Sequence, residues 1–334
     1  MKIFITGVAG FLGSHLADLM IAQGHKVAGN DNMIGGYADN VPQGVEFHQV
    51  DCCDLENLTK AMEGCDIVYH TAATAYEGLS VFSPVLVTRN IFEASVTTIT
   101  AAIRNNVKRI VYCSSMARYG HHDKMPYRED YECRPQDPYG IAKKAGEDVL
   151  KNLCETHGVE YVIAVPHNIV GPRQKYDDPF RNVMSIMLNR MLQGKQPIIY
   201  GDGEQQRCFS YIDDCLYCLN ALAFQDNVAG EVINIGPDEE PITINELAEA
   251  CANETGINLD PIHHKDRPKE VKLAVCSSDK ARDLLGYNTA TNMRQSVKKT
   301  AEYIRSRGTK KFQYHLPLEI INDQTPDTWK KKLI

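Results

Sequence analysis

Three closely spaced glycines near the start of the chain limit its fold more than any other feature of the sequence. A short apolar run, residues 3–5, leads directly into Gly7, Gly10 and Gly13, and a helical pattern follows over residues 12–23. A strand, a tight glycine turn and a helix in this order bring the backbone N–H groups of a helix N-terminus close to an anion. The turn therefore predicts a phosphate site at the end of the first strand.

The end of the second predicted strand indicates which phosphate compound would bind. This strand, residues 26–31, ends in Asp31, which lies 18 residues after Gly13. A carboxylate at this place accepts hydrogen bonds from an adenosine ribose and repels a ribose 2′-phosphate. No arginine stands beside Asp31 in the sequence. The pattern therefore predicts NAD in preference to NADP.

Short apolar strands alternate with helical patterns through the first half of the chain, which predicts a parallel sheet covered on both faces. The predicted strands are residues 2–7, 26–31, 45–51, 66–73, 109–115 and 160–172, with one more strand of the same sheet at 231–236. The predicted helices are residues 12–23, 55–62, 86–105 and 138–157. We therefore expect an α/β fold, a Rossmann-type doubly wound parallel sheet, with residues 1–172 and the interleaved residues 209–236 as the NAD-binding domain.

The alternation of strands and helices ends at Pro172. The elements predicted beyond it are a helix at 177–195, a strand, turn and strand at 197–214, and a helix at 242–256. Residues 309–334 show no clear period. We expect residues 173–334 to form mostly a smaller mixed α/β substrate-binding lobe.

Composition and charge narrow the class of protein. The chain has 334 residues and a formal net charge of −7, which argues against a nucleic-acid partner. No apolar run approaches the ~18 residues that cross a membrane, so we expect no membrane partner. The eleven cysteines and eleven histidines lack the spacing of a metal site. The sequence also lacks a signal-peptide pattern. We therefore expect the cysteine thiols to be reduced and the protein to be cytoplasmic.

A tyrosine and a lysine four residues apart form a second group of interest. Tyr139 and Lys143 lie at the start of the helix predicted over 138–157, so both side chains project from one face. A nearby ammonium and a nicotinamide cation would favour the phenolate of Tyr139, which would make it a base at neutral pH. A serine at the end of the strand predicted over 109–115 would hold the substrate oxygen.

Taken in order along the chain, these motifs resemble those of the extended short-chain dehydrogenase/reductases. The similarity is to the nucleotide-sugar epimerases and dehydratases of that family, and most closely to the 4-epimerases of UDP-hexoses. The matching segments are TGVAGFLG, DNM, VDCCD, VYHTAA, DPYGIAK, VGPRQ, YGDGEQQRCFSYIDD and DRPKEV. The resemblance implies a nucleotide-sugar substrate, NAD as cofactor, and a homodimer paired through the helices at 86–105 and 138–157.

The resemblance also implies a role for each matching residue. Tyr139 would be the base, Lys143 would hold the nicotinamide ribose, and Ser115 would contact the reacting hydroxyl. The residues implied to border NAD are Gly7, Gly10, Phe11, Leu12, Gly13, Asp31, Asn32, Asp51, Cys52, Ala72, Ala73, Asn90 and His167, besides Tyr139 and Lys143. The residues implied to bind the nucleotide-sugar are Asn168 and Asn182, with Arg207 and Arg267 at its diphosphate, where forked cationic donors suit paired oxygens.

The two residues after Ser115 bear on the reaction. The 4,6-dehydratases that the chain resembles carry an Asp-Glu pair there, whereas this sequence has Met116 and Ala117, which cannot transfer protons. The decarboxylating relatives also use an acid there, and the GDP-mannose 3,5-epimerases have a cysteine in place of Ala117. A 4-epimerase needs no such group, because the 4-keto sugar turns over and takes the hydride back on its other face. Elimination thus favours C4 epimerisation of a UDP-hexose, UDP-N-acetylhexosamine or UDP-uronic acid.

Three departures from the family pattern leave alternatives open. His167 and Cys208 stand where an aromatic residue and an aspartate are usual. Either would permit 5-epimerisation or dehydration as a second acid–base group, or else His167 packs on the nicotinamide and Cys208 packs in the core. Arg118 would bind the carboxylate of a uronic acid or form a structural ion pair. A non-catalytic NAD-binding regulator is the alternative of another class, although such proteins usually lack the tyrosine or the lysine.

Overall fold

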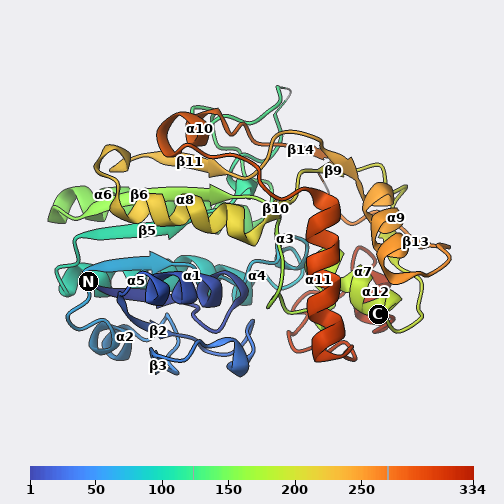
Figure 1. The fold of residues 1–334 in the computed structure, drawn as a ribbon, viewed down its shortest axis with the longest axis horizontal. Coiled ribbons are helices and arrows are strands. Elements are labelled where there is room, and N and C mark those ends of the chain that lie inside the picture. The colour runs from blue at the N-terminus through green and yellow to red at the C-terminus, as the bar shows by residue number, and fades with distance from the viewer. Residues whose placement is uncertain (123, 269–270) are drawn as a thin grey trace.

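The computed structural model describes residues 1–122, 124–268 and 271–334. The strands of its main sheet are β1 (Lys2–Thr6), β2 (Lys26–Asn30), β3 (Val45–His48), β4 (Ile67–His70), β5 (Arg109–Cys113), β6 (Glu160–Pro166) and β11 (Val232–Ile235). Within the described residues these seven strands run parallel in the order β11-β6-β5-β4-β1-β2-β3 (Figure 1). The predicted doubly wound parallel sheet is confirmed, including the late strand at its edge.

Successive residues of the central strand β1 face opposite sides of the sheet, and each side packs on its own layer of helices. The helices against the sheet are α1 (Phe11–Ala22), α2 (Leu55–Ala61), α5 (Ala94–Arg104), α6 (Pro138–His157), α8 (Ile212–Phe224) and α10 (Asp279–Leu285). Ile3 and Ile5 are buried in the core beneath α1 and α8. Phe4 is buried in the core beneath α2, α5 and α6. The sheet is therefore covered on both faces, and its polar opening lies at the strand ends.

The helix predicted over residues 138–157 is confirmed as α6 with the same bounds. Its first position is Pro138, and the Asp137 carboxylate accepts a hydrogen bond from the Gly140 backbone N–H at 2.8 Å. Its last turn is closed by Gly158 in the left-handed conformation. These start and stop residues are the ones that helix termini favour, which explains why the sequence alone located the helix.

The prediction of one continuous helix over residues 86–105 is wrong in detail. The chain forms α4 (Pro84–Thr88), a π-helical turn η2 (Arg89–Glu93) and then α5. The wider turn buries the Asn90 side chain, whose amide donates to the Thr74 hydroxyl at 3.0 Å. A π turn inserts one residue into a helix, and apolar periodicity does not reveal it.

The helix predicted over 177–195 is shorter than expected, because α7 begins only at Val183 and ends at Met191. Asn182 precedes it with a φ of +65°, in the left-handed region. The Asp178 carboxylate accepts a hydrogen bond from the Phe180 backbone N–H at 2.8 Å, which is a turn and not a helix. The segment before α7 is therefore a loop that lies against the site described below.

The C-terminal elements pack around a separate apolar core. Its helices are α7, α9 (Ile244–Thr255) and α11 (Met293–Arg307). The short strands near them are β7 (Ile169–Val170), β8 (Ile198–Tyr200), β9 (Gln206–Arg207), β10 (Ser210–Tyr211), β12 (Ile242–Thr243), β13 (Ile262–His264) and β14 (Leu273–Ala274). Among the described residues, no helix combines the length and the apolar character needed to cross a membrane.

Residues 309–334, which show no period in the sequence, form an irregular segment with one short helix, α12 (Asp327–Lys330). The segment leaves α11 and contacts the residues between α3 (Glu77–Ser80) and α4. It then returns to β8, where the Tyr200 and Thr328 hydroxyls lie 2.5 Å apart. Figure 1 shows α12 and the C-terminus beside α7, at the end of the molecule opposite α2.

Candidate active site

A cavity of about 430 Å³ opens at the carboxyl ends of the central strands and extends toward α7 and β8. Parallel sheets bind ligands at such strand ends, where the strand order reverses on either side of β1. The structure brings nearly all predicted site residues to this cavity. Those that line it are Gly7, Gly10, Phe11, Leu12, Gly13, Asp31, Asn32, Asp51, Cys52, Ala72, Ala73, Asn90, Ser115, Tyr139, Lys143, His167, Asn168, Asn182, Arg207 and Arg267.

The glycine turn forms one end of the cavity. Gly7 has a φ of +71°, and a Cβ there would lie 2.9 Å from the Ala72 Cα. A Cβ on Gly13 would lie 2.3 Å from the Gly7 carbonyl oxygen. Helix α1 can therefore pack this close to the turn only because residue 13 has no side chain. The N-cap Gly10 supplies no side-chain acceptor, and the first turn of α1 has no acidic residue. Its N–H groups therefore suit a diphosphate.

Asp31 lies beside this turn at the end of β2. Its carboxylate accepts hydrogen bonds from the backbone N–H of Met33 at 2.7 Å and of Ala9 at 3.1 Å. Burial raises the pKa of Asp31, and these N–H donors act against that rise. The Asn32 amide donates to the Asp51 carboxylate at 3.0 Å, which joins two strand ends around the adenosine position. The residues present thus fit the NAD predicted from the sequence.

Ser115, Tyr139 and Lys143 meet at the middle of the cavity. Tyr139 is buried in the first turn of α6 and is hydrogen-bonded to the Ser115 side chain. Lys143, one turn later, donates from Nζ to the Cys113 carbonyl at 2.7 Å. Ser115 follows β5 and caps the short 3-10 turn η3 (Met116–Arg118) by accepting from the Ala117 backbone N–H at 3.2 Å. The three side chains are thus fixed by a strand end and a helix start.

The sequence predicts that the Lys143 ammonium and a nicotinamide cation together favour the phenolate of Tyr139, and the structure adds the effect of burial. Burial raises the pKa of Tyr139 above its ordinary value, and the Ser115 hydrogen bond offsets this only in part. Burial also lowers the pKa of Lys143 to about 8, while the nearby Glu147 carboxylate raises it. Desolvation thus has the largest effect on the pKa of Tyr139.

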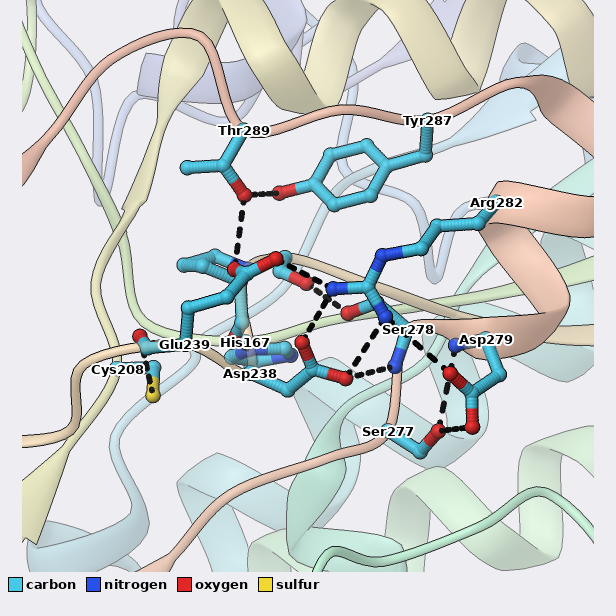
Figure 2. A network of polar contacts seen from close by, with 12 residues as sticks. His167, Cys208, Asp238, Glu239, Ser277, Ser278, Asp279, Arg282, Tyr287 and Thr289 are labelled. Atoms are coloured by element: carbon cyan, nitrogen blue, oxygen red, sulfur yellow. Dashed lines mark hydrogen bonds and ion pairs between the residues drawn. The ribbon is translucent and has the colours of Figure 1, made fainter.

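His167 borders the cavity and is hydrogen-bonded to the loop of residues 237–239 (Figure 2). Its Nε2 lies 2.9 Å from the Pro237 carbonyl oxygen, so Nε2 carries the proton and Nδ1 is an acceptor. Nδ1 is buried and has no hydrogen-bond partner in the part of the chain that the structure describes. The loop is fixed by Arg282, which pairs with the Asp238 and Glu239 carboxylates. Burial lowers the pKa of His167, which therefore stays neutral and cannot donate from Nδ1.

Cys208 is not among the described residues that line the cavity. Its Sγ lies 3.6 Å from the Glu239 carbonyl oxygen, as Figure 2 shows. Burial raises the pKa of this thiol to about 12. The hypothesis that Cys208 is a second acid–base group is therefore not supported, and its position is that of a core residue.

All predicted site residues lie in the described ranges. Among them, only Arg118 does not line the cavity. Its Nη2 lies 2.9 Å from the Glu147 Oε2, and both side chains are buried. Glu147 also accepts a short hydrogen bond from the Ser114 hydroxyl. The substrate-binding role predicted for Arg118 is thus corrected to the structural ion pair that the sequence left open.

The residues predicted to bind the nucleotide-sugar lie at the far end of the cavity. Asn168 donates from Nδ2 to the Cys208 carbonyl at 2.9 Å, which fixes its amide beside Met116. The Arg267 guanidinium lies 4.9 Å from the centre of the Tyr200 ring. Arg207 lies on β9 and reaches the same end of the cavity. Two cationic forks at one end suit a diphosphate group.

Sequence reasoning missed several residues that line the cavity, because no motif marks them. They are Ile34, Gly35, Gly36, Thr74, Tyr76, Glu77, Gly78, Asp178, Phe180, Arg181, Tyr200, Trp329 and Ile334, among others. Tyr76 donates a short hydrogen bond to the Asp178 carboxylate, and the Arg181 guanidinium lies 5.5 Å from the Tyr76 ring centre. The Asp-Pro-Phe-Arg segment before α7 is a local turn signal, and it falls inside the helix predicted over 177–195.

Comparisons with known proteins agree with this geometry. The sequence model of the NAD dependent epimerase/dehydratase family matches residues 3–236. A relative named as a putative UDP-glucose 4-epimerase of Methanocaldococcus jannaschii is 32% identical over 315 residues, covering 91% of this chain and 98% of its own.

Solved structures of 4-epimerases are also similar to this chain. The UDP-glucose 4-epimerase of Thermotoga maritima with UDP-glucose has a TM-score of 0.87 at 30% identity, covering 92% of this chain and 99% of its own. The UDP-glucuronic acid 4-epimerase of Bacillus cereus, with UDP-glucuronic acid and NAD, has a TM-score of 0.84 at 28% identity, with coverages of 92% and 100%. The glycine turn and Asp31 fit the NAD that the Bacillus cereus structure contains. The chain therefore belongs to the NAD-dependent epimerase/dehydratase family, and its cofactor is NAD.

Proposed function

We propose that this chain is a nucleotide-sugar 4-epimerase that acts at C4 of a UDP-hexose, a UDP-N-acetylhexosamine or a UDP-uronic acid. The observation that carries the proposal is the meeting of Ser115, Tyr139 and Lys143 at a cavity that continues to Arg207 and Arg267. The first three residues suit oxidation of a hydroxyl, and the two arginines suit the diphosphate of its carrier.

Each residue of the group has a separate task in the proposed reaction. The Tyr139 phenolate takes the proton of the sugar C4 hydroxyl, while the Ser115 hydroxyl holds the same oxygen. Lys143 and the glycine turn would hold NAD, which would supply the hydride acceptor for C4 and a cationic ring that favours the phenolate of Tyr139. Lys143, fixed by the Cys113 carbonyl, holds the cofactor ribose with its remaining N–H donors. Tyr139 then returns the proton when the ketone is reduced on its opposite face.

The surroundings of Ser115 support epimerisation at C4 over elimination or decarboxylation. Met116 borders the cavity and Ala117 follows it, so neither position offers a proton. His167 has its one proton committed to the Pro237 carbonyl. Glu77 is a carboxylate that lines the cavity, and its charge raises the pKa of Tyr139. A dehydratase or 5-epimerase, the second candidate, would need a second acid–base group, for which Glu77 and the Nδ1 of His167 both border the cavity.

Nuclear magnetic resonance of the enzyme with candidate substrates in D2O tests the proposal. The substrates are UDP-glucose, UDP-N-acetylglucosamine and UDP-glucuronic acid. We expect a C4 epimer that contains no deuterium. Deuterium at C5 or loss of water would instead establish the second candidate, and the variants Glu77→Gln and His167→Phe would then show which of the two residues it uses. Absence of turnover with every substrate would leave a non-catalytic NAD-binding regulator.

The proposal extends to the organisation of the protein. We place cofactor binding in residues 1–172 with 209–236, and substrate binding mostly in residues 173–334. A homodimer paired through α4, α5 and α6 is supported by Val85 and Ile141, which are 71% and 54% exposed on that surface. All eleven cysteines lie in described ranges and are free thiols, which supports a cytoplasmic location. Light scattering tests the dimer.

A further inference from the structure

The segment 309–334 is fastened at its start to the substrate region. The Asn189 amide donates to the Lys310 carbonyl at 2.9 Å, and the Lys310 backbone N–H donates back to the Asn189 Oδ1 at 3.1 Å. The Gln313 backbone N–H donates to the Asp177 carbonyl at 2.8 Å. These bonds run from α7 and the loop before it, which both line the cavity.

The middle of the segment is fastened to the NAD-binding region. The Ser83 hydroxyl donates to the Pro317 carbonyl at 2.6 Å. The Glu319 carboxylate accepts from the backbone N–H of Val85 at 2.8 Å and of Leu86 at 2.9 Å, at the first turn of α4. The segment therefore bridges the two regions that face each other across the cavity.

An apolar cluster joins the segment to both regions. Its buried members are Tyr76, Leu79, Phe82, Phe180, Leu316 and Trp329. Trp329 is only 2% exposed and packs edge-on against Phe180 at 5.5 Å and against Phe82 at 6.1 Å between ring centres. Phe82 follows β4 and Phe180 precedes α7, so the indole fills the seam between the two regions.

The end of the segment forms cavity wall. Trp329 and Ile334 both line the cavity. A Cβ added to Gly78 would lie 3.4 Å from the Arg267 Nη1 and 3.5 Å from the Trp329 Cη2, so the indole edge and the guanidinium meet at this glycine. Arg267 in turn lies over the Tyr200 ring, whose hydroxyl bonds Thr328, the neighbour of Trp329.

The solved relatives leave part of this chain unmatched. The Thermotoga maritima structure covers 92% of this chain but 99% of its own length, and the Bacillus cereus structure shows the same imbalance. About 8% of this chain therefore has no counterpart in either, a share equal in size to residues 309–334. The family match ends earlier, at residue 236.

We infer that residues 309–334 are part of the substrate-binding site and that Trp329 is a specificity-determining wall residue for the nucleoside diphosphate sugar. The inference rests on the proposed function, because it places the diphosphate at Arg267. The indole edge holds Arg267 and Gly78 in position and closes the cavity beside them. Loss of the indole weakens binding of the nucleotide-sugar, whereas the glycine turn and Asp31, which bind NAD, keep their contacts.

The chain itself supplies the probe for the test, because Trp329 is its only tryptophan. Indole emission of the enzyme loaded with NAD is followed while UDP, and then UDP-glucose, is added. Calorimetry measures the same binding independently. We expect a saturable change in emission with the dissociation constant that calorimetry gives. Binding that calorimetry detects but that leaves the emission unchanged would overturn the inference.

Variants complete the test. We expect Trp329→Ala to raise the dissociation constant for UDP about ten-fold, which is the loss of one aromatic contact, with NAD binding unchanged. Trp329→Phe should restore most of the affinity. The matched control is Ile321→Ala, in the same segment but 62% exposed, which should bind as the wild type does.

The outcomes separate the two proposals. Equal affinity of Trp329→Ala and wild type for UDP would overturn the inference alone. An equal loss of UDP and NAD binding in Trp329→Ala would show a general structural defect and would also overturn it. Failure of the wild type to bind UDP or any UDP-sugar would overturn both this inference and the proposed function.

Discussion

The two ends of the cavity are built in different ways. At the NAD end, the backbone forms the site: a turn between β1 and α1 approaches the ligand because Gly7 and Gly13 have no side chains. At the other end, side chains from distant segments form it: Phe180 and Arg267 come from two loops and Trp329 from the short helix α12. A site made by one turn is fixed by local rules, whereas a wall made by three distant segments depends on the packing of the whole chain.

The comparison of the two cavity ends predicts first that the chemical step depends only on residues at the NAD end, where the strands of the main sheet terminate. Tyr139→Phe removes the proton acceptor while keeping the ring, so we expect kcat to fall by about 10²–10⁴-fold with little change in UDP binding. Steady-state kinetics and calorimetry measure the two effects. The control is Tyr217→Phe, on the exposed side of α8, which should be fully active. A Tyr139→Phe enzyme with undiminished kcat would remove Tyr139 from the mechanism.

The second prediction concerns the buried ion pair behind the catalytic group. Glu147→Gln leaves the Arg118 guanidinium buried without its counter-charge, so we expect a loss of about 3–5 kcal/mol in the free energy of unfolding. Urea denaturation measures it. The double variant Arg118→Met with Glu147→Leu removes both charges and should regain most of the stability. A loss below about 1 kcal/mol in the single variant would contradict the burial of this pair.

The third prediction is that the free energy of unfolding depends on pH through Lys143, at the same end of the cavity. Burial lowers the pKa of Lys143 from 10.5 to about 8, so between these values the unfolded chain binds one proton more than the folded chain does. The free energy of unfolding should therefore rise with pH across that window, by about 3 kcal/mol in total. The destabilisation from the buried Lys143 ammonium is fully present below pH 8. Urea denaturation at several pH values follows the rise. Lys143→Met should lack this component, and an identical profile in both proteins would refute it.

The smallest expected effect lies at the other end. Glu319→Gln weakens the cap that the segment 309–334 places on the first turn of α4, because it removes the negative charge near the backbone N–H groups of Val85 and Leu86. We expect a loss of about 0.5–1 kcal/mol in the free energy of unfolding, measured by thermal denaturation. Glu302→Gln on α11 is an exposed control. A loss as large as that of Glu147→Gln would mean that the two ends are not built differently.

Much of the sheet end could be predicted from the sequence. The turn at Gly7, the acid at Asp31 and both ends of α6 follow local rules of backbone geometry and capping. Family resemblance then located Ser115 and the two arginines of the substrate end, because their motifs occur in a fixed order. All of these reach one cavity because parallel strands end at one edge of the sheet.

The remaining features depend on contacts between distant residues. Arg118 and Glu147 lie 29 positions apart, and no periodicity indicates that both are buried and paired. The late start of α7 depends on the turn at Asp178, which Tyr76 from another loop stabilises. Trp329 lies in a segment without any regular pattern, so only packing against Phe82 and Phe180 determines where its ring lies.

The π-helical turn at residues 89–93 has a consequence for how the chain can vary in length. Removing one residue there would restore an ordinary α-helix, which turns about 100° and rises ~1.5 Å per residue. The helical residues before the deletion would rotate by that angle relative to α5, which would carry Asn90 away from Thr74 and turn the exposed Val85 toward a new direction. Insertions and deletions should therefore be absent from this segment among chains that keep the contact between Asn90 and Thr74, although they are common in the loops around it.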